Sequence, residues 1–175
     1  IYNVLASITV LKELNLDISK IKLKLKHLSP SEGRGKKYFI SRYNKKINFI
    51  DESYNANPSS VKTAIKKLDS INKGNYKKYL ILGDMLELGS KSKKYHEELS
   101  KVINNSDIDK IFIKGKKTIF TYKHLIKEKR GNILQNDDDV DLCLSEMISN
   151  NDFLMIKGSN ATGLNSFSKK LIRGV

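Results

Sequence analysis

The sequence contains little of what marks secreted or membrane proteins. Its single cysteine, Cys143, excludes an internal disulfide and a zinc site built from cysteines, and it suits a reducing compartment. No apolar run approaches the roughly 20 residues needed to cross a bilayer, and no signal-like apolar segment is present. These absences predict a cytoplasmic protein without a membrane span.

The sequence also lacks two common nucleotide-binding motifs, and its histidines are not spaced as metal ligands. The sequence has neither a Gly-x-x-x-x-Gly-Lys-Ser/Thr loop nor a Gly-x-Gly-x-x-Gly string after a strand, so this chain does not cradle a triphosphate by the usual means. Its three histidines, His27, His96 and His124, are scattered over predicted helices without metal-ligand spacing. We expect no metal site here and structural or surface roles for these histidines.

The charge of the chain is strongly positive but evenly spread. The 33 lysines and arginines oppose 19 aspartates and glutamates, which gives a formal charge of +14. Only four of the basic residues are arginines, and lysines occur in every segment rather than in one patch interleaved with aromatic residues. This pattern favours a general drift of composition. It predicts no specific nucleic-acid partner, only weak adsorption to polyanions at low salt.

Two helices are predicted at the start of the chain. Apolar residues recur at helical spacing from Tyr2 to Leu14. Asp17 or Ser19 can then cap a second helix that runs to about Leu28.

A linker is predicted after these helices, because the segment 29–35 combines serine, proline and glycine. We therefore place a domain boundary between residues 1–30 and residues 31–175. Because Ile1 is not a methionine and the chain opens inside helical periodicity, we expect a piece of a longer protein.

After the linker, apolar strands alternate with amphipathic helices. The strands are predicted at 37–42, 45–50, 79–82, 111–113, 133–134 and 153–156. The helices are predicted at 59–71, 92–103, 118–129, 137–149 and 164–173. Continuous apolar strands of this kind are typical of a mainly parallel sheet covered on both faces. The predicted fold class is therefore α/β, a Rossmann-like doubly wound sheet, whose ligands bind beyond the carboxyl ends of the strands.

Three of the predicted loops at those ends crowd polar groups together. Residues 51–58 combine two carboxylates, a serine hydroxyl and two carboxamides, which can hold a ribose or a zwitterionic substrate, although asparagine and proline also suit ordinary turns and helix caps. Residues 157–163 offer Lys157 and backbone amides to an anion, or form a plain glycine turn. Residues 83–89 carry acidic side chains that can meet a polar ligand, or form a solvated loop.

Four strings of residues, in this order, resemble the carboxy-terminal part of a Mur ligase. They are EGRG at 32–35, DESYNANP at 51–58, LGDMLELG at 82–89 and IKGS at 156–159. The resemblance extends over essentially the whole chain. It implies that residues 1–30 are the last helices of a central ATP-binding domain, and that residues 31–175 are the complete Rossmann-like carboxy-terminal domain.

The resemblance implies an ATP-dependent ligase of peptidoglycan synthesis that joins D-alanyl-D-alanine to UDP-N-acetylmuramoyl-tripeptide. In such ligases the P-loop that holds ATP and Mg²⁺ lies in the central domain, so we expect the isolated chain to be inactive, and monomeric. Two alternatives stay open. One is another Mur ligase that adds a single amino acid, against which the string from Tyr54 to Asn57 argues. The other is a non-catalytic basic binding module on a Rossmann-like scaffold.

The resemblance also implies roles for individual residues. Asn3 would contact adenine, Arg34 would reach the ATP phosphates or ribose, and either Asp51 or Glu52 would bind the ribose hydroxyls. The acceptor dipeptide would be lined by Ser53, Asn55, Asn57, Lys157 and Ser159. Arg34 and Lys157 are the candidate catalytic residues, because cations neutralise the charge that develops during phosphoryl and acyl transfer.

Overall fold

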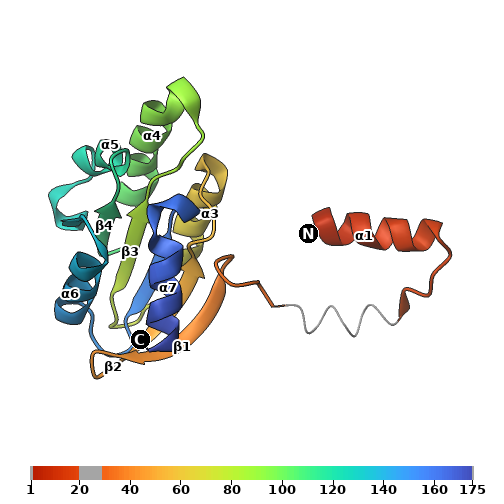
Figure 1. The fold of residues 1–175 in the computed structure, drawn as a ribbon, viewed down its shortest axis with the longest axis horizontal. Helices are drawn as coiled ribbons and strands as arrows, with labels where there is room; N and C mark the ends of the chain where they lie inside the picture. Colours follow the sequence, from red (N-terminus) through yellow and green to blue (C-terminus); the bar gives the residue numbers. More distant parts are fainter. Residues whose placement is uncertain (1, 20–28, 175) are drawn as a thin grey trace. The chain divides into compact units, whose positions relative to one another are not determined.

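A computed structural model of the chain describes residues 2–19 and 29–174 (Figure 1). The chain divides into two compact units, Ile1–Pro30 and Ser31–Val175. In the part of the chain that the structure describes, no helix is long and apolar enough to cross a membrane.

The first unit contains helix α1 (Tyr2–Glu13). Two of its apolar side chains, Leu5 and Val10, are more than half exposed, at 52% and 57%. The helix ends in a turn at which Asn15 takes a left-handed backbone conformation with φ 51°. The second helix that the sequence predicts, up to about Leu28, lies almost entirely outside the described residues.

The second unit is built on a six-stranded sheet in the order β1-β2-β6-β3-β4-β5. The strands are β1 (Lys36–Arg42), β2 (Lys45–Glu52), β3 (Lys78–Gly83), β4 (Lys110–Lys114), β5 (Arg130–Leu134) and β6 (Phe153–Lys157). β1 and β2 form an antiparallel hairpin whose turn residues, Tyr43 and Asn44, both have the positive φ values of a tight hairpin turn. The other neighbouring pairs are parallel. The predicted Rossmann-like α/β class is confirmed.

Helices cover both faces of this sheet (Figure 1). They are α3 (Pro58–Asp69), α4 (Ser92–Asn104), α5 (Thr118–Lys123), α6 (Asp137–Met147) and α7 (Leu164–Arg173). The first three pack on one face, and α6 and α7 on the other. In β3, Tyr79 and Ile81 enter the core beneath α6 and α7, whereas Leu80 and Leu82 enter the opposite core. A strand that is buried on both faces needs such a continuous apolar run.

One helix is shorter than its periodicity predicts. The pattern indicates a helix over 118–129, but α5 ends at Lys123. The side chain of Asn104, on α4, donates to the His124 carbonyl oxygen (3.0 Å) and accepts from the Ile126 amide (3.1 Å). A side chain from a neighbouring helix thus satisfies backbone groups at the end of α5, and the helix can stop there.

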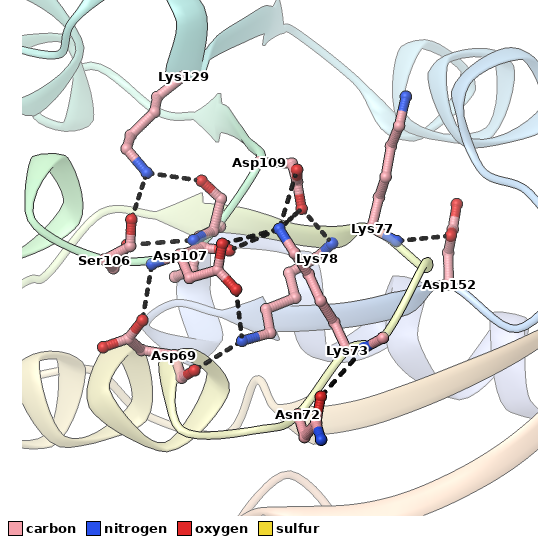
Figure 2. A network of polar contacts seen from close by, with 12 residues as sticks. Asp69, Asn72, Lys73, Lys77, Lys78, Ser106, Asp107, Asp109, Lys129 and Asp152 are labelled. Atoms are coloured by element: carbon pink, nitrogen blue, oxygen red, sulfur yellow. Dashed lines mark hydrogen bonds and ion pairs between the residues drawn. The ribbon is translucent and has the colours of Figure 1, made fainter.

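Lysines and aspartates form a polar network at the amino ends of β3 and β4 (Figure 2). Lys78 is fully buried; its ammonium donates to the Asp69 carbonyl oxygen (2.6 Å) and lies 3.5 Å from the Asp107 carboxylate. Lys73 bridges the carboxylates of Asp107 (2.8 Å) and Asp109 (3.0 Å). The Asp109 carboxylate also accepts the backbone N–H of Lys78 (2.8 Å). We call these five residues and Lys129 the amino-edge network.

Opposite charges in this network shift one another's pKa values so that both groups stay ionised. Burial opposes the charge of Lys73, but its hydrogen bonds to Asp107 and Asp109 outweigh that effect and raise its pKa. The hydrogen bond from Lys73 in turn lowers the pKa of Asp107. Lys129 extends the network by donating to two carbonyl oxygens of the α4–β4 connection (2.6 and 2.8 Å), as Figure 2 shows. The amino edge therefore consists largely of internally paired charges.

Candidate functional site

The carboxyl ends of the parallel strands carry two adjoining cavities, which we call cavity A (about 360 Å³) and cavity B (about 370 Å³). Cavity A is lined by Tyr54, Asn55, Leu86, Glu87, Ser159, Asn160 and Ala161. Cavity B is lined by Asp84, Leu86, Lys114, Gly115, Lys116, Ile133, Leu134, Gln135, Ala161 and Thr162. The two cavities meet at Leu86 and Ala161. A further cavity of about 370 Å³ is lined by Arg42 and by residues of α6 and α7.

Asp51, at the end of β2, is buried and uses its carboxylate to hold neighbouring groups of the chain. One oxygen accepts the Gly33 amide (2.8 Å), and the other accepts the hydroxyl (2.5 Å) and the amide (3.2 Å) of Ser53. Asn165, on α7, donates to the Ser53 hydroxyl oxygen (3.1 Å). Asp51 and Ser53 thus lie at the predicted edge, but a ligand would compete with these internal hydrogen bonds.

Arg34 presents its charge at the surface beside cavity A. Gly33 adopts a left-handed conformation (φ 71°), and a Cβ on it would lie 2.6 Å from the Tyr54 Cβ, so only glycine allows this close approach. The guanidinium carbon of Arg34 lies 4.4 Å from the centroid of the Tyr54 ring, within cation–π distance. Arg34 is itself exposed, so the guanidinium can meet a further partner.

The other residues predicted for the ATP site are Glu52 and Asn3. Glu52 keeps 19% of its side chain exposed and lies 3.4 Å from the Lys67 ammonium. Unlike Asp51, it has a carboxylate that solvent can reach. Asn3 belongs to α1, but its side chain lies outside the described part of the chain.

The two predicted asparagines of the 51–58 loop have different surroundings. The Asn57 side chain accepts the Ser60 amide (2.8 Å), and the Ser60 hydroxyl oxygen accepts the Asn57 amide (3.1 Å), which forms a capping box at the start of α3. Asn57 is therefore a helix cap. Asn55 is exposed and lines cavity A, with its side-chain oxygen accepting the Ala56 amide (2.8 Å).

Lys157, at the end of β6, is 2% exposed and connects two strands. Its ammonium donates to the Glu52 carbonyl oxygen (3.3 Å) and to the Asn55 carbonyl oxygen. Burial lowers the pKa of Lys157, and the nearby Glu52 carboxylate opposes this. The ammonium thus anchors the loop that carries Asn55 to the end of β6.

Ser159 connects three loops at the same edge. Its hydroxyl oxygen accepts the Leu86 amide (3.0 Å), and its hydroxyl donates to the Ala56 carbonyl oxygen (3.4 Å). Its own amide donates to the Asp84 carbonyl oxygen (3.0 Å). The loops after β2, β3 and β6 are therefore held together at one buried side chain.

His96, on α4, is fully buried and holds the loop after β3. Its Nδ1 lies 2.8 Å from the Ser92 carbonyl oxygen and its Nε2 lies 3.1 Å from the Met85 nitrogen. Only the neutral ring with the hydrogen on Nδ1 satisfies both partners, because Nε2 must accept the Met85 N–H. The Thr121 hydroxyl donates to the His96 carbonyl oxygen (2.7 Å), which adds α5 to this contact. His96 therefore orients the loop between the two cavities.

Asp84 fixes the loop after β4. One oxygen of its carboxylate accepts the amides of Lys117 (2.9 Å) and Thr118 (2.8 Å). Gly115 has φ 136°, and a Cβ there would lie 2.4 Å from the same oxygen. This backbone conformation and this spacing both require glycine.

Three residues that line the cavities, Tyr54, Glu87 and Lys116, were not individually predicted as site residues, although Tyr54 and Glu87 belong to loops that were expected to contact a ligand. Tyr54 and Glu87 line cavity A, and Lys116 lines cavity B. Their common signal is position, since each follows closely after the carboxyl end of a parallel strand, where α/β sheets bind ligands.

Comparison with protein families identifies the class to which this fold and site belong. Residues 39–160 match the family described as Mur ligase, glutamate ligase domain. The chain therefore belongs to the Mur ligase family, and the family predicted from its sequence is confirmed.

The curated relatives point to one member of that family. The chain is 32% identical over 151 residues to the UDP-N-acetylmuramoyl-tripeptide–D-alanyl-D-alanine ligase of Bacillus subtilis (strain 168), with 84% of this chain and 33% of the relative covered. It is 32% identical over 175 residues to the ligase of the same name from Buchnera aphidicola subsp. Baizongia pistaciae, with 99% of the chain and 36% of the relative covered. The chain thus spans about a third of the length of these relatives.

Solved structures agree on the fold. The MurF ligase of Thermotoga maritima, in a complex with ADP, matches with a TM-score of 0.75 at 23% identity, over 99% of this chain and 38% of that one. MurF of Acinetobacter baumannii matches with a TM-score of 0.71 at 24% identity, over 96% and 36% of the two chains.

Proposed function

We propose that this chain is the acceptor-binding end of an ATP-dependent ligase that joins D-alanyl-D-alanine to UDP-N-acetylmuramoyl-tripeptide in peptidoglycan synthesis. The observation that carries the proposal is the convergence of three loops on cavity A, with Asn55 from the first, Glu87 from the second and Asn160 from the third. These loops end neighbouring strands, where α/β sheets bind ligands. Two curated relatives carry the name of this ligase, which supports the choice of substrates.

The proposed reaction uses one ATP for each amide bond. ATP transfers its γ-phosphoryl group to the carboxylate of the tripeptide, which yields an acyl phosphate and ADP. The amine of D-alanyl-D-alanine then attacks the acyl carbon; the C–N bond forms, inorganic phosphate leaves with the electrons of the C–O bond, and the amine loses a proton. A protein accelerates such steps mainly by aligning the reactants and by neutralising the charge that develops.

For the ATP side of the reaction, we assign Arg34 to the phosphates or ribose, because its guanidinium is exposed beside cavity A. Of the two candidate carboxylates, Glu52 suits the ribose hydroxyls better, because the Asp51 carboxylate already accepts hydrogen bonds from Gly33 and Ser53. We also propose that Asn3 contacts the adenine of ATP.

For the acceptor side, we assign Asn55 and Tyr54 to direct contact with the dipeptide, because both are exposed in cavity A. The other predicted residues would act through the loops that they hold: Ser53, Asn57, Lys157 and Ser159. Lys157 would influence catalysis by fixing the position of Asn55, whose carbonyl oxygen accepts from its ammonium.

We place the ATP phosphates and Mg²⁺ mainly on a part of the ligase outside this chain. The chain lacks a P-loop, and within residues 2–19 and 29–174 no three acidic, histidine or cysteine side chains gather into a metal site. The isolated chain is therefore proposed to be inactive. The buried free thiol of Cys143 suits a reducing compartment, which supports a cytoplasmic location.

The test is an acceptor assay with the full-length ligase to which the chain is proposed to belong. With ATP and UDP-N-acetylmuramoyl-tripeptide, D-alanyl-D-alanine should yield ADP, phosphate and the pentapeptide product, and single amino acids should not. Use of a single amino acid instead of the dipeptide would replace this proposal with another Mur ligase activity. ATP hydrolysis by the isolated 175-residue chain, with both other substrates present, would overturn its proposed dependence on a central domain.

A further inference from the structure

Cavity B contains a lysine that the proposed reaction leaves unused. Lys116 is exposed, lines the cavity, and has no carboxylate of the described chain within ion-pair distance. The other lysine of the cavity, Lys114, is only 11% exposed and pairs with Asp137 (2.7 Å). Lys116 is therefore the cation of this cavity that remains available to a ligand.

The backbone that carries Lys116 is held firmly although its side chain is not. The Asp84 carboxylate accepts the amides of Lys117 and Thr118, and the Thr118 hydroxyl donates to the Gly115 carbonyl oxygen (3.1 Å). The residues that form these hydrogen bonds, Gly115, Lys117 and Thr118, flank Lys116 in the sequence. A cation on a fixed backbone next to a cavity is the arrangement that an anion-binding group requires.

The two adjoining cavities are lined by different unpaired charges. Glu87 is the charged residue that lines cavity A, and the described residues offer it no cation within ion-pair distance. In cavity B, Asp137 neutralises Lys114, and Lys116 is the lysine left without an ion pair among the described residues. The Asp84 carboxylate, which also lines cavity B, accepts the amides of Lys117 and Thr118. Between them stand the apolar side chains of Leu86 and Ala161, which line both cavities. Together the cavities fit a zwitterion with small apolar side chains.

We propose that cavity B is the subsite for the carboxylate of the acceptor dipeptide and that Lys116 binds this carboxylate, while the amine of the dipeptide lies in cavity A. This inference rests on the proposed function. In an extended dipeptide the amine and carboxylate can be separated by about 7 Å, against about half of that in a single amino acid. In this arrangement a dipeptide would reach into both cavities, whereas a single amino acid would occupy only one of them. Lys116 therefore helps to select the dipeptide.

The experiment compares two neighbouring lysines in the full-length ligase. Lys116→Gln removes the proposed carboxylate contact, and Lys117→Gln is the matched control, because Lys117 is exposed but does not line either cavity. Steady-state kinetics are measured with D-alanyl-D-alanine and with D-alanyl-D-alaninamide, which lacks the carboxylate charge. Lys116→Arg tests whether another cation restores the contact.

We expect Lys116→Gln to raise the KM for D-alanyl-D-alanine about tenfold, the effect of losing one charged hydrogen bond, with little change in kcat. The KM for the amide should hardly change, because the amide has already lost this contact. Lys117→Gln should match the wild type, and Lys116→Arg should recover most of the affinity. The KM values for ATP and the UDP-linked tripeptide should not move.

An unchanged KM for the dipeptide in Lys116→Gln, or equal losses with the dipeptide and the amide, would overturn the subsite. Failure of the wild-type ligase to use D-alanyl-D-alanine at all would instead overturn the proposed function, so the two failures can be told apart. Thermal unfolding of both glutamine variants confirms that each retains its fold.

Discussion

Lys73 and Lys78, at the amino ends of the strands, pair with carboxylates, whereas Lys157, at a carboxyl end, donates to backbone carbonyls. Lys116, also at a carboxyl end, has no acceptor in the described chain. Lys73 and Lys78 illustrate the first arrangement, since both lie within ion-pair distance of the Asp107 carboxylate. Lys157 illustrates the second, because its ammonium donates to two carbonyl oxygens of the loop after β2. One residue type therefore serves two purposes in the same sheet.

This difference shows how one edge of a sheet can be stabilised by paired charges while the other edge keeps charged groups available to a ligand. At the amino edge opposite charges neutralise one another, and little charge is left for a ligand. At the carboxyl edge Ser159 and His96 bond to the backbone, so the loops are fixed without the use of the exposed charges of Arg34, Glu87 and Lys116. Backbone-directed bonds orient a site and leave its charged groups free for substrate.

The largest expected effect comes from comparing two arginines at opposite edges. Arg34→Ala in the full-length ligase should lower kcat about a hundredfold, the usual loss when one transition-state donor is removed. Arg42 ends β1 at the opposite edge, 3.9 Å from the Asp141 carboxylate, so Arg42→Ala should leave kcat unchanged. Steady-state kinetics measure both. Equal losses in the two variants would contradict the distinction between the edges.

The second comparison uses the two buried lysines. Lys157→Met should lower kcat/KM for the dipeptide about thirtyfold, because a loosened Asn55 loop misaligns the acceptor. Lys78→Met should leave the kinetics unchanged but lower the free energy of unfolding by about 1–3 kcal/mol, because buried partners such as the Asp69 carbonyl oxygen lose their donor. Urea unfolding and kinetics of both variants are the measurements. A fully active Lys157→Met enzyme would show that the anchor is unnecessary.

A smaller effect is expected at His96. His96→Leu leaves the Met85 amide without its acceptor, so the loop between the cavities shifts and the KM for the dipeptide should rise about tenfold. His96→Gln can still accept this amide and should retain much of the affinity. Kinetics of the two variants at matched thermal stability test the contact. Equal behaviour of leucine and glutamine would mean that His96 acts through packing alone.

The smallest effect concerns pH at the amino edge. The hydrogen bond from Lys73 lowers the pKa of Asp107 below the ordinary 3.8, so its contribution is present above that pH and is lost as the pH falls through the lowered pKa. Because the Asp107 side chain is 60% exposed, we expect only a few tenths of a kcal/mol.

Urea unfolding of the wild type and of Asp107→Asn tests this dependence, at about pH 6 and about pH 2. The stability difference should shrink at the lower pH. A difference that persists there would have to come from packing and not from the charge of Asp107.

Much of the fold was predictable because its signals are local. Apolar runs and helical spacing predicted the strands and most helices, and the polar strings were correctly expected to follow strand ends. The shortened α5 was not predictable, because it depends on the Asn104 side chain from a different helix. The amino-edge network was not predicted either, since its lysines resemble all the others in the sequence.

The site was predictable as a set of loops but not as a set of roles. A loop serine or aspartate can bind a ligand or the backbone, and the choice depends on which groups the fold brings near. Ser159 meets Leu86 and Ala56, which are 73 and 103 residues away in the sequence. Asp51 likewise binds Gly33, 18 residues away. Whether these side chains face a ligand was therefore invisible in the sequence.

By itself the sequence determined the Mur ligase family, the α/β class, the order of the elements and the excess of positive charge. Only the tertiary structure decided which charges are neutralised and which remain for a ligand. Lys78 finds Asp107 at a sequence separation of 29 residues, and Lys73 finds Asp109 at 36. Lys116 finds no such partner among the described residues. Charge pairing depends on distances between side chains of different elements, and the packing of the sheet sets those distances.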